Sequence, residues 1–203
     1  MEYNELKNNQ IELNTTATNA EIMGAIEMRE SWIKETFWAL SNLTAGSPTV
    51  LEQFLDINIE YGNGRTAFDK LVEVCYLSTQ IVPHKKLFVE SLFALCNFLT
   101  EASEEQLRGI RNDSVTELLV YCLVDSEIIM QIKQGKDAVE NVLEALLRLM
   151  KIDWSEFMSN DIGFSRMVNQ FEELGGRDHV ERLKECQNED IEKLAAELIE
   201  LLA

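Results

Sequence analysis

Apolar residues recur every three or four positions along most of the chain, in segments separated by short polar breaks. This spacing predicts amphipathic α-helices, because the apolar residues of a half-buried strand would recur with a period of two. The chain has 2 prolines and 9 glycines, which is few for a turn-rich all-β fold, so we expect an all-α protein. The expected helices cover approximately residues 20–28, 30–45, 50–57, 66–77, 85–101, 104–110, 114–124, 127–150, 164–174, 178–186 and 190–202.

A series of short, medium and long helices recurs along the chain. WALSNLTAG at 38–46 resembles FALCNFLTE at 93–101, and both place an Asn four residues after an aromatic residue. A third long helix, NVLEALLRL at 141–149, keeps the leucines but not the aromatic residue or the Asn. Repeats of helix triplets predict an α-solenoid, whereas the periodicity alone also allows a helical bundle. We expect one solenoid domain at 18–203, preceded by a loosely ordered segment at 1–17 that has little to bury.

The net charge of −18 argues against nucleic-acid and membrane partners, since phosphate groups and anionic lipids would be repelled. A basic protein or peptide is the complementary partner, although a charged helical surface also serves solubility. No apolar run reaches the roughly 20 residues that a membrane-spanning helix needs. The polar first residues do not resemble a secretory signal, so we expect a cytoplasmic and nuclear protein.

The sequence gives no support for catalysis or for a bound cofactor. It has no G-x-S-x-G, no glycine-rich phosphate loop and no H-E-x-x-H, so we expect a protein that is not an enzyme. The four cysteines are far apart and lie among apolar residues, which predicts reduced, buried thiols rather than a metal site. These cysteines are Cys75, Cys96, Cys122 and Cys186.

Trp38 and Asn42 lie one turn apart on the same side of a predicted helix, and Glu35 joins them. Asn is unfavourable inside a helix, so its presence beside a tryptophan needs a reason. One interpretation is structural: a core tryptophan next to a capping or buried amide. The other is a binding surface, in which the amide hydrogen-bonds a peptide backbone while the indole packs against a basic side chain.

The segment KETFWALSNLTAG at 34–46 resembles a motif of the C-terminal armadillo repeats of the importin α family, K-E-x-x-W-x-(I/L)-S-N-(I/L)-T-A-G. ESLFALCN at 90–97 resembles the equivalent motif of the following repeat, with Phe93 in place of the family's tryptophan. LEALLRL at 143–149 and the segment 171–200, which begins FEELGG, are similar to later family segments in the same order. The family's basic N-terminal segment and upstream repeats have no counterpart here, so the chain is either a piece of a relative or a short relative.

The resemblance implies a right-handed armadillo solenoid of about four repeats, the first of them incomplete. It also implies that a concave groove binds basic nuclear localisation signal peptides in extended form. The tryptophan and asparagine rows would line this groove, and Phe93 would offer a smaller ring than indole. The implied peptide-binding residues are Glu35, Trp38, Ser41, Asn42, Glu90, Phe93 and Asn97.

The resemblance implies a nuclear-import adaptor, with an export receptor of the cellular-apoptosis-susceptibility type and nucleoporins as further partners of the C-terminal repeats. The alternative is an armadillo scaffold that no longer recognises localisation signals and instead binds a folded partner. An incomplete first repeat would expose apolar surface, so we expect some self-association there. Trp32 and Trp154 match no family motif, and we expect both to be packing residues.

Overall fold

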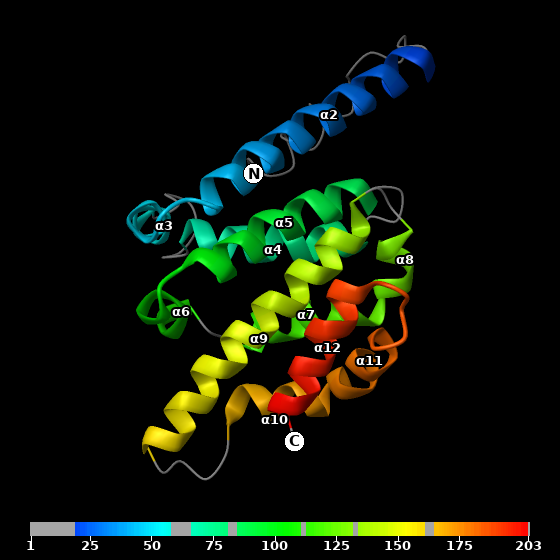
Figure 1. The fold of residues 1–203 in the computed structure, drawn as a ribbon. Coiled ribbons are helices and arrows are strands. Elements are labelled where there is room, and N and C mark those ends of the chain that lie inside the picture. Colours follow the sequence, from blue (N-terminus) through cyan, green and yellow to red (C-terminus); the bar gives the residue numbers. More distant parts are fainter. Residues whose placement is uncertain are drawn as a thin grey trace, which may run out of the picture.

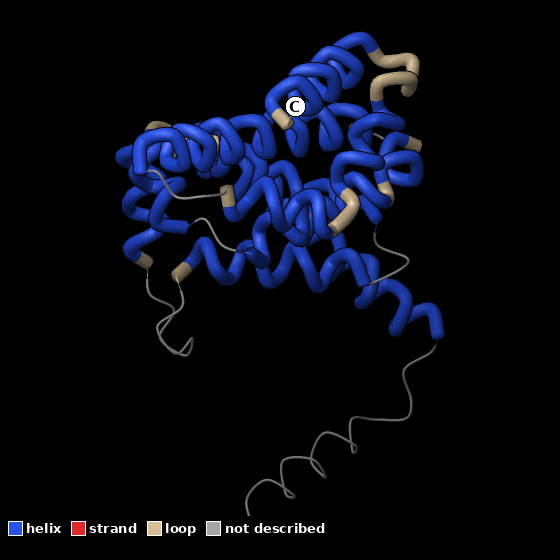
Figure 2. Tube along the Cα trace, turned by 90° about the horizontal axis from the view of Figure 1, so that it is seen from below, coloured by secondary structure: helices blue, strands red, loops and turns tan. Residues whose placement is uncertain are grey.

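The computed structural model describes residues 19–57, 66–80, 85–110, 113–131, 134–160 and 165–202. The expected loosely ordered segment at 1–17 lies outside these residues. Every regular element within them is helical, as Figure 2 shows, and the all-α prediction is confirmed for this part of the chain. None of the described helices is long and apolar enough to cross a membrane.

Eleven helices form the described structure, and most of them agree with the predicted ranges to within a few residues. The bounds are α2 (Asn19–Thr44), α3 (Pro48–Asp56), α4 (Ala67–Gln80), α5 (Lys85–Glu101), α6 (Glu104–Ile110), α7 (Asp113–Val124), α8 (Ser126–Met130), α9 (Gly135–Asn160), α10 (Arg166–Glu173), α11 (Gly176–Leu183) and α12 (Glu189–Leu201).

Two predicted divisions between helices are wrong, and α9 continues to Asn160, beyond the predicted end at 150. The predicted helices at 20–28 and 30–45 are one continuous helix, α2, because no proline or glycine interrupts the chain between them. The predicted helix at 127–150 is instead two helices, α8 and α9. Gln134 adopts a left-handed backbone with φ 64° between them, and a Cβ on Gly135 would lie 1.7 Å from the carbonyl oxygen of Ile129. This close backbone approach requires glycine at 135 and separates the two helices.

Side-chain hydrogen bonds fix where several helices begin. Before α4, the backbone N–H of Thr66 donates to Asp69 Oδ2 at 2.8 Å, and the N–H of Asp69 donates to Thr66 Oγ1 at 3.2 Å. Ser103 and Gln106 make the same reciprocal pair before α6. Such pairs satisfy backbone donors that lack partners within the first turn of a helix.

The helices pack as two layers, which can be followed in Figure 1. In the first layer, called the inner layer below, α2 packs on α5, α5 on α9, and α9 on α12. In the second layer α4 packs on α7 and α7 on α11, and the two layers are joined by the contacts of α4 with α5, α7 with α9, and α11 with α12. The three-helix units α3–α4–α5, α6–α7–α9 and α10–α11–α12 therefore follow one another along the stack, and α2 precedes them.

The core is built from the apolar faces of these units. In the first unit the Phe98 ring packs against Phe54 and Phe68, with centroid distances of 5.7 and 4.8 Å, so α3, α4 and α5 share one aromatic cluster. Aromatic pairs at such distances add to the free energy gained from burying the rings. Phe171 is fully buried in the last unit, where it packs under Gly176.

The four cysteines are free, as predicted, but only three of them are buried. Burial raises the pKa of the Cys75 thiol to about 12 and holds the pKa values of Cys96 and Cys122 well above the usual range. Cys186 is half-exposed because it lies in the turn after α11 rather than on a packed helix face. The prediction that all four thiols are buried is therefore wrong for Cys186.

The prediction that Trp32 and Trp154 are packing residues is also wrong. Trp32 is 70% exposed and Trp154 is 40% exposed. Trp32 lies on α2, the first helix that the structure describes, and Figure 1 shows that the C-terminal part of α9, which carries Trp154, projects beyond α12. Periodicity identifies an apolar position but does not show whether a neighbouring helix covers it. Self-association through the exposed side chains of α2 stays a prediction.

Candidate functional site

Two polar contacts hold α2 and α5 side by side in a parallel arrangement. Near the start of α5, Lys34 Nζ lies 3.6 Å from Glu90 Oε1. Two turns further on, Asn97 Nδ2 donates a hydrogen bond to the carbonyl oxygen of Ser41 at 3.1 Å. Residue numbers increase in the same direction along both helices, so each contact fixes the register of one helix against the other.

Trp38 and Phe93 lie between these two contacts, one on each helix. Trp38 is 59% exposed, while Phe93 is half-buried and packs against the core. On α5, Glu90, Phe93 and Asn97 are half-exposed, and most of the residues between them are buried. We call this surface the α2–α5 face and define it by Lys34, Trp38, Ser41, Glu90, Phe93 and Asn97. It presents an exposed indole on α2 and a half-buried phenyl ring on α5, with the Lys34–Glu90 ion pair at one end and the Asn97 amide at the other.

The other two predicted residues lie further round α2. Glu35 and Asn42 are exposed beside Trp38, on the side of the helix away from the buried Phe37. Asn42 Nδ2 donates to the carbonyl oxygen of Trp38 at 2.9 Å, and Ser41 Oγ donates to the same carbonyl at 2.9 Å. One N–H of the Asn42 amide is therefore used within its own helix, which leaves the second N–H and the amide oxygen for a ligand.

Lys34 was not among the predicted site residues, although it stands next to Glu35 in the same motif. Its ammonium group occupies the position beside Glu90 that a ligand cation would take. A cationic ligand would have to displace Lys34 or share the carboxylate with it. The signal that could have found Lys34 is its place in the row Lys34, Trp38 and Ser41, whose spacing puts all three on one side of α2.

Carboxylates continue the inner layer beyond α5. Burial raises the pKa of Glu140 on α9, and the nearby carboxylates of Asp190, Glu144 and Asp137 raise it further. The pKa of the Cys96 thiol on α5 is raised first by burial, then by Cys75 and then by Glu144. The carboxylate of Glu144 therefore lies close to α5. The charges therefore gather where α9 meets α5 and α12, and they give this part of the inner layer a negative potential.

The described residues contain no cluster of histidine, cysteine and carboxylate side chains that could hold a metal ion. What the α2–α5 face offers chemically is exposed aromatic surface, amide groups and carboxylates. These groups can bind a polar or cationic chain, and they include no nucleophile paired with a base.

No known protein family matches this chain, and no curated protein is significantly similar to it. One similar solved structure is described as an engineered protein, Northeast Structural Genomics Consortium target OR329. The similarity covers 94% of this chain and 93% of that chain, with 13% identical residues and a TM-score of 0.36. A likeness this weak carries no argument about function, so the conclusion that stands is an all-α chain with an exposed aromatic and amide face on α2 and α5.

Proposed function

We propose that the chain is a non-catalytic adaptor of the armadillo type that binds extended basic peptides on its inner layer. Three consecutive three-helix units with stacked third helices support a right-handed solenoid of about four units, in which α2 belongs to the first. The resemblance of residues 34–46 and 90–97 to importin α repeats favours nuclear localisation signals as the peptides.

The observation that carries the proposal is the exposed Trp38, which lies on α2 between two contacts that join this helix to α5. An indole with this much exposure gains free energy when an apolar stem covers it, and the stem of a lysine or arginine also brings a cation over the ring. Each such contact contributes about 0.5–2 kcal/mol, so micromolar affinity needs several of them. The carboxylates around Glu140 supply long-range attraction for the same cations.

The test is a fluorescence-polarisation titration with a labelled peptide that contains two clusters of lysine and arginine. Trp38→Ala should weaken binding by about 1–3 kcal/mol, because it removes the aromatic contact and the desolvated surface around it. Trp32→Ala is the matched control, since Trp32 is an exposed tryptophan of the same helix on a different side. Equal affinity of both variants and the parent protein would contradict the proposed binding face.

A second candidate function is a scaffold that binds a folded partner. It is favoured because polar groups of the site already bond to other groups of this chain. The amides of Asn42 and Asn97 donate to helix carbonyls, and Glu90 forms an ion pair with Lys34. The Asn42→Ala variant separates the two functions. Loss of peptide affinity at unchanged thermal stability supports the adaptor, whereas unchanged affinity supports the scaffold.

A further inference from the structure

The ion pair at one end of the α2–α5 face joins an exposed side chain to one that is mostly covered. The Lys34 side chain on α2 is 49% exposed, whereas the Glu90 side chain on α5 is 13% exposed. Val89 and Ser91, the neighbours of Glu90 in α5, are buried, so this part of the helix is fixed by packing. Lys34 is therefore the partner that can turn away into solvent.

The two side chains attract each other without forming a hydrogen bond. The distance of 3.6 Å from Lys34 Nζ to Glu90 Oε1 exceeds the range of about 2.7–3.2 Å that is usual for an N–H···O bond. Within the described part of the chain, no other group donates to the Glu90 carboxylate or pairs with it. The carboxylate oxygens thus keep their capacity to accept hydrogen bonds from a ligand.

A ligand cation that reaches Glu90 has to displace Lys34 rather than share the carboxylate with it. So little of the Glu90 side chain is exposed that two cations on it would lie close together and repel each other. The displaced ammonium group is strongly hydrated, and the loss of an ion pair with such an exposed partner costs little. A cation at hydrogen-bond distance would gain more from Glu90 than Lys34 loses.

From these observations we propose that Lys34 is an internal competitor for Glu90, which lowers the affinity of the α2–α5 face for basic peptides. The inference rests on the function proposed above and adds a way in which the affinity of that site is controlled. In the free protein Lys34 neutralises Glu90, and in the complex a cation of the peptide replaces it. Removal of the charge at position 34 therefore tightens binding, whereas a stronger partner for Glu90 at this position weakens it.

Two substitutions of Lys34 with opposite expected effects test the proposal, in a fluorescence-polarisation titration with the labelled basic peptide. Lys34→Met keeps an unbranched stem without the charge and should lower Kd about threefold. Lys34→Arg keeps the charge and can donate two parallel hydrogen bonds to Glu90, so it should raise Kd about twofold to threefold. If the ion pair only held α2 in place for binding, Lys34→Met would weaken binding and Lys34→Arg would preserve it. That result would overturn the inference.

The gain from Lys34→Met should depend on Glu90. In a Glu90→Gln background it should fall to the value found for Lys70→Met, which measures the effect of net charge alone. Lys70 on α4 is a matched control, because its side chain is also 49% exposed and also forms an ion pair, with Glu73 at 2.9 Å. Equal gains from Lys34→Met and Lys70→Met in the parent background would refute a role for Lys34 as competitor.

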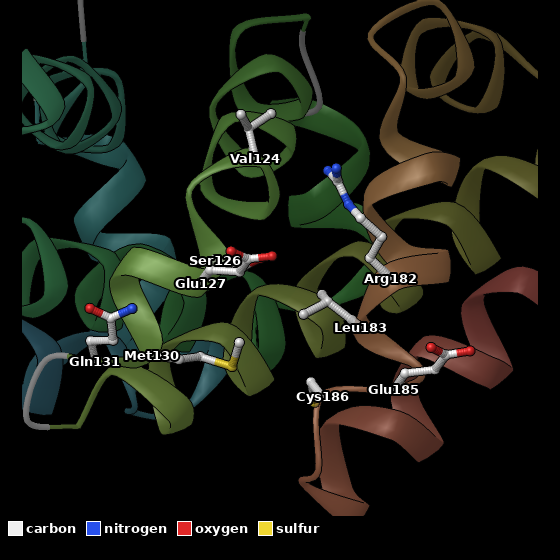
Figure 3. A pocket seen from close by; sticks show the side chains of 9 residues that line it. All are labelled: Val124, Ser126, Glu127, Met130, Gln131, Arg182, Leu183, Glu185 and Cys186. Carbon is white, nitrogen blue, oxygen red and sulfur yellow. The ribbon is translucent and has the colours of Figure 1, made fainter.

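A cavity of about 490 Å³ between α8 and α11 is another place at which a basic peptide could bind. Figure 3 shows that Glu127 and the cationic Arg182 come from different walls of this cavity. Arg182→Met removes one positive charge there and should change the affinity no more than Lys70→Met does. A gain from Arg182→Met as large as that from Lys34→Met would place the peptide in the cavity and overturn the inference.

Failure of the proposed function would give a different result from failure of this inference. If neither the parent protein nor Lys34→Met binds the peptide, the function proposed for the α2–α5 face is wrong, and the role of Lys34 is wrong with it. If the parent protein binds the peptide and Trp38→Ala weakens binding, while neither substitution of Lys34 changes Kd, only the inference about Lys34 is wrong.

Discussion

Gly109 and Gly176 are two helical glycines in opposite surroundings. A Cβ added at Gly176 would lie 2.4 Å from the ring of Phe171, which is fully buried. A Cβ added at Gly109 would meet nothing within 4 Å. In the sequence Gly109 stands between Arg108 and Ile110, and Gly176 follows Gly175, but neither setting shows how much space surrounds the residue, which only the packed structure reveals.

We predict opposite effects of alanine at these two positions. Gly176→Ala should lower the free energy of unfolding by about 1–3 kcal/mol, because the methyl group overpacks the core against Phe171. Gly109→Ala should raise it by about 0.5–1 kcal/mol, since alanine restricts the unfolded chain and fits the helix. Urea unfolding followed by circular dichroism measures both. A stable Gly176→Ala variant would mean that Phe171 can shift.

The two asparagines of the predicted site should also differ in what they contribute to stability. Asn97→Ala removes the hydrogen bond between α5 and the Ser41 carbonyl of α2 and should cost about 1 kcal/mol. Asn42→Ala removes a bond within one exposed helix and should leave stability unchanged or raise it by about 0.5 kcal/mol. Thermal unfolding of the two variants in parallel checks the ranking. The reverse order would assign the structural role to Asn42.

At the scale of elements, the sequence was sufficient to locate most helices. The ranges 85–101 and 104–110 agree with α5 and α6 at both ends, because polar breaks and capping residues mark them. The pattern failed where a boundary depends on backbone geometry, as at Gln134 and Gly135. It also failed for Trp32, since coverage by a neighbouring helix is a property of the whole stack.

The boundary between α8 and α9 can be tested through Gln134, whose left-handed backbone is unfavourable for a residue with a Cβ. Gln134→Gly should raise the free energy of unfolding by about 0.5–1 kcal/mol, because glycine adopts this conformation without strain. Gln131→Gly is the control: its backbone is right-handed, so glycine there should destabilise the protein by a similar amount. Denaturant midpoints at constant m-value give both changes. Stabilisation by both substitutions would contradict this explanation.

At the scale of the molecule, the sequence predicted those residues of the candidate site whose spacing puts them on one side of a single helix. Trp38, Phe93 and Asn97 do come to one surface, held by contacts across α2 and α5. The pairing of Lys34 with Glu90 and the carboxylates contributed by α9 and α12 arise from packing between distant segments. Spacing within one helix carries no information about such pairs.

The acidic cluster should make stability depend on pH through Glu140. The pKa of Glu140 is raised in the folded protein. Glu140 therefore contributes most to the stability of the fold below the usual pKa of 4.5, and this contribution is lost as the pH rises through the folded pKa. Glu140→Gln should therefore raise the free energy of unfolding by about 0.5 kcal/mol at pH 7, with a slight rise in Tm. This gain should vanish near pH 4.5. Glu117→Gln, at an exposed position of α7, is the control. A gain that persists at low pH would exclude the electrostatic cause.

The exposure of all three tryptophans has an optical consequence. Trp32, Trp38 and Trp154 emit from contact with water in the folded protein, so the native fluorescence spectrum should already resemble that of the unfolded chain. Unfolding will then change the emission wavelength little, and circular dichroism becomes the better reporter of folding. The same circumstance makes Trp38 a sensor: a ligand that covers it should shift the emission to the blue, and Trp38→Phe should abolish that shift while Trp32→Phe preserves it.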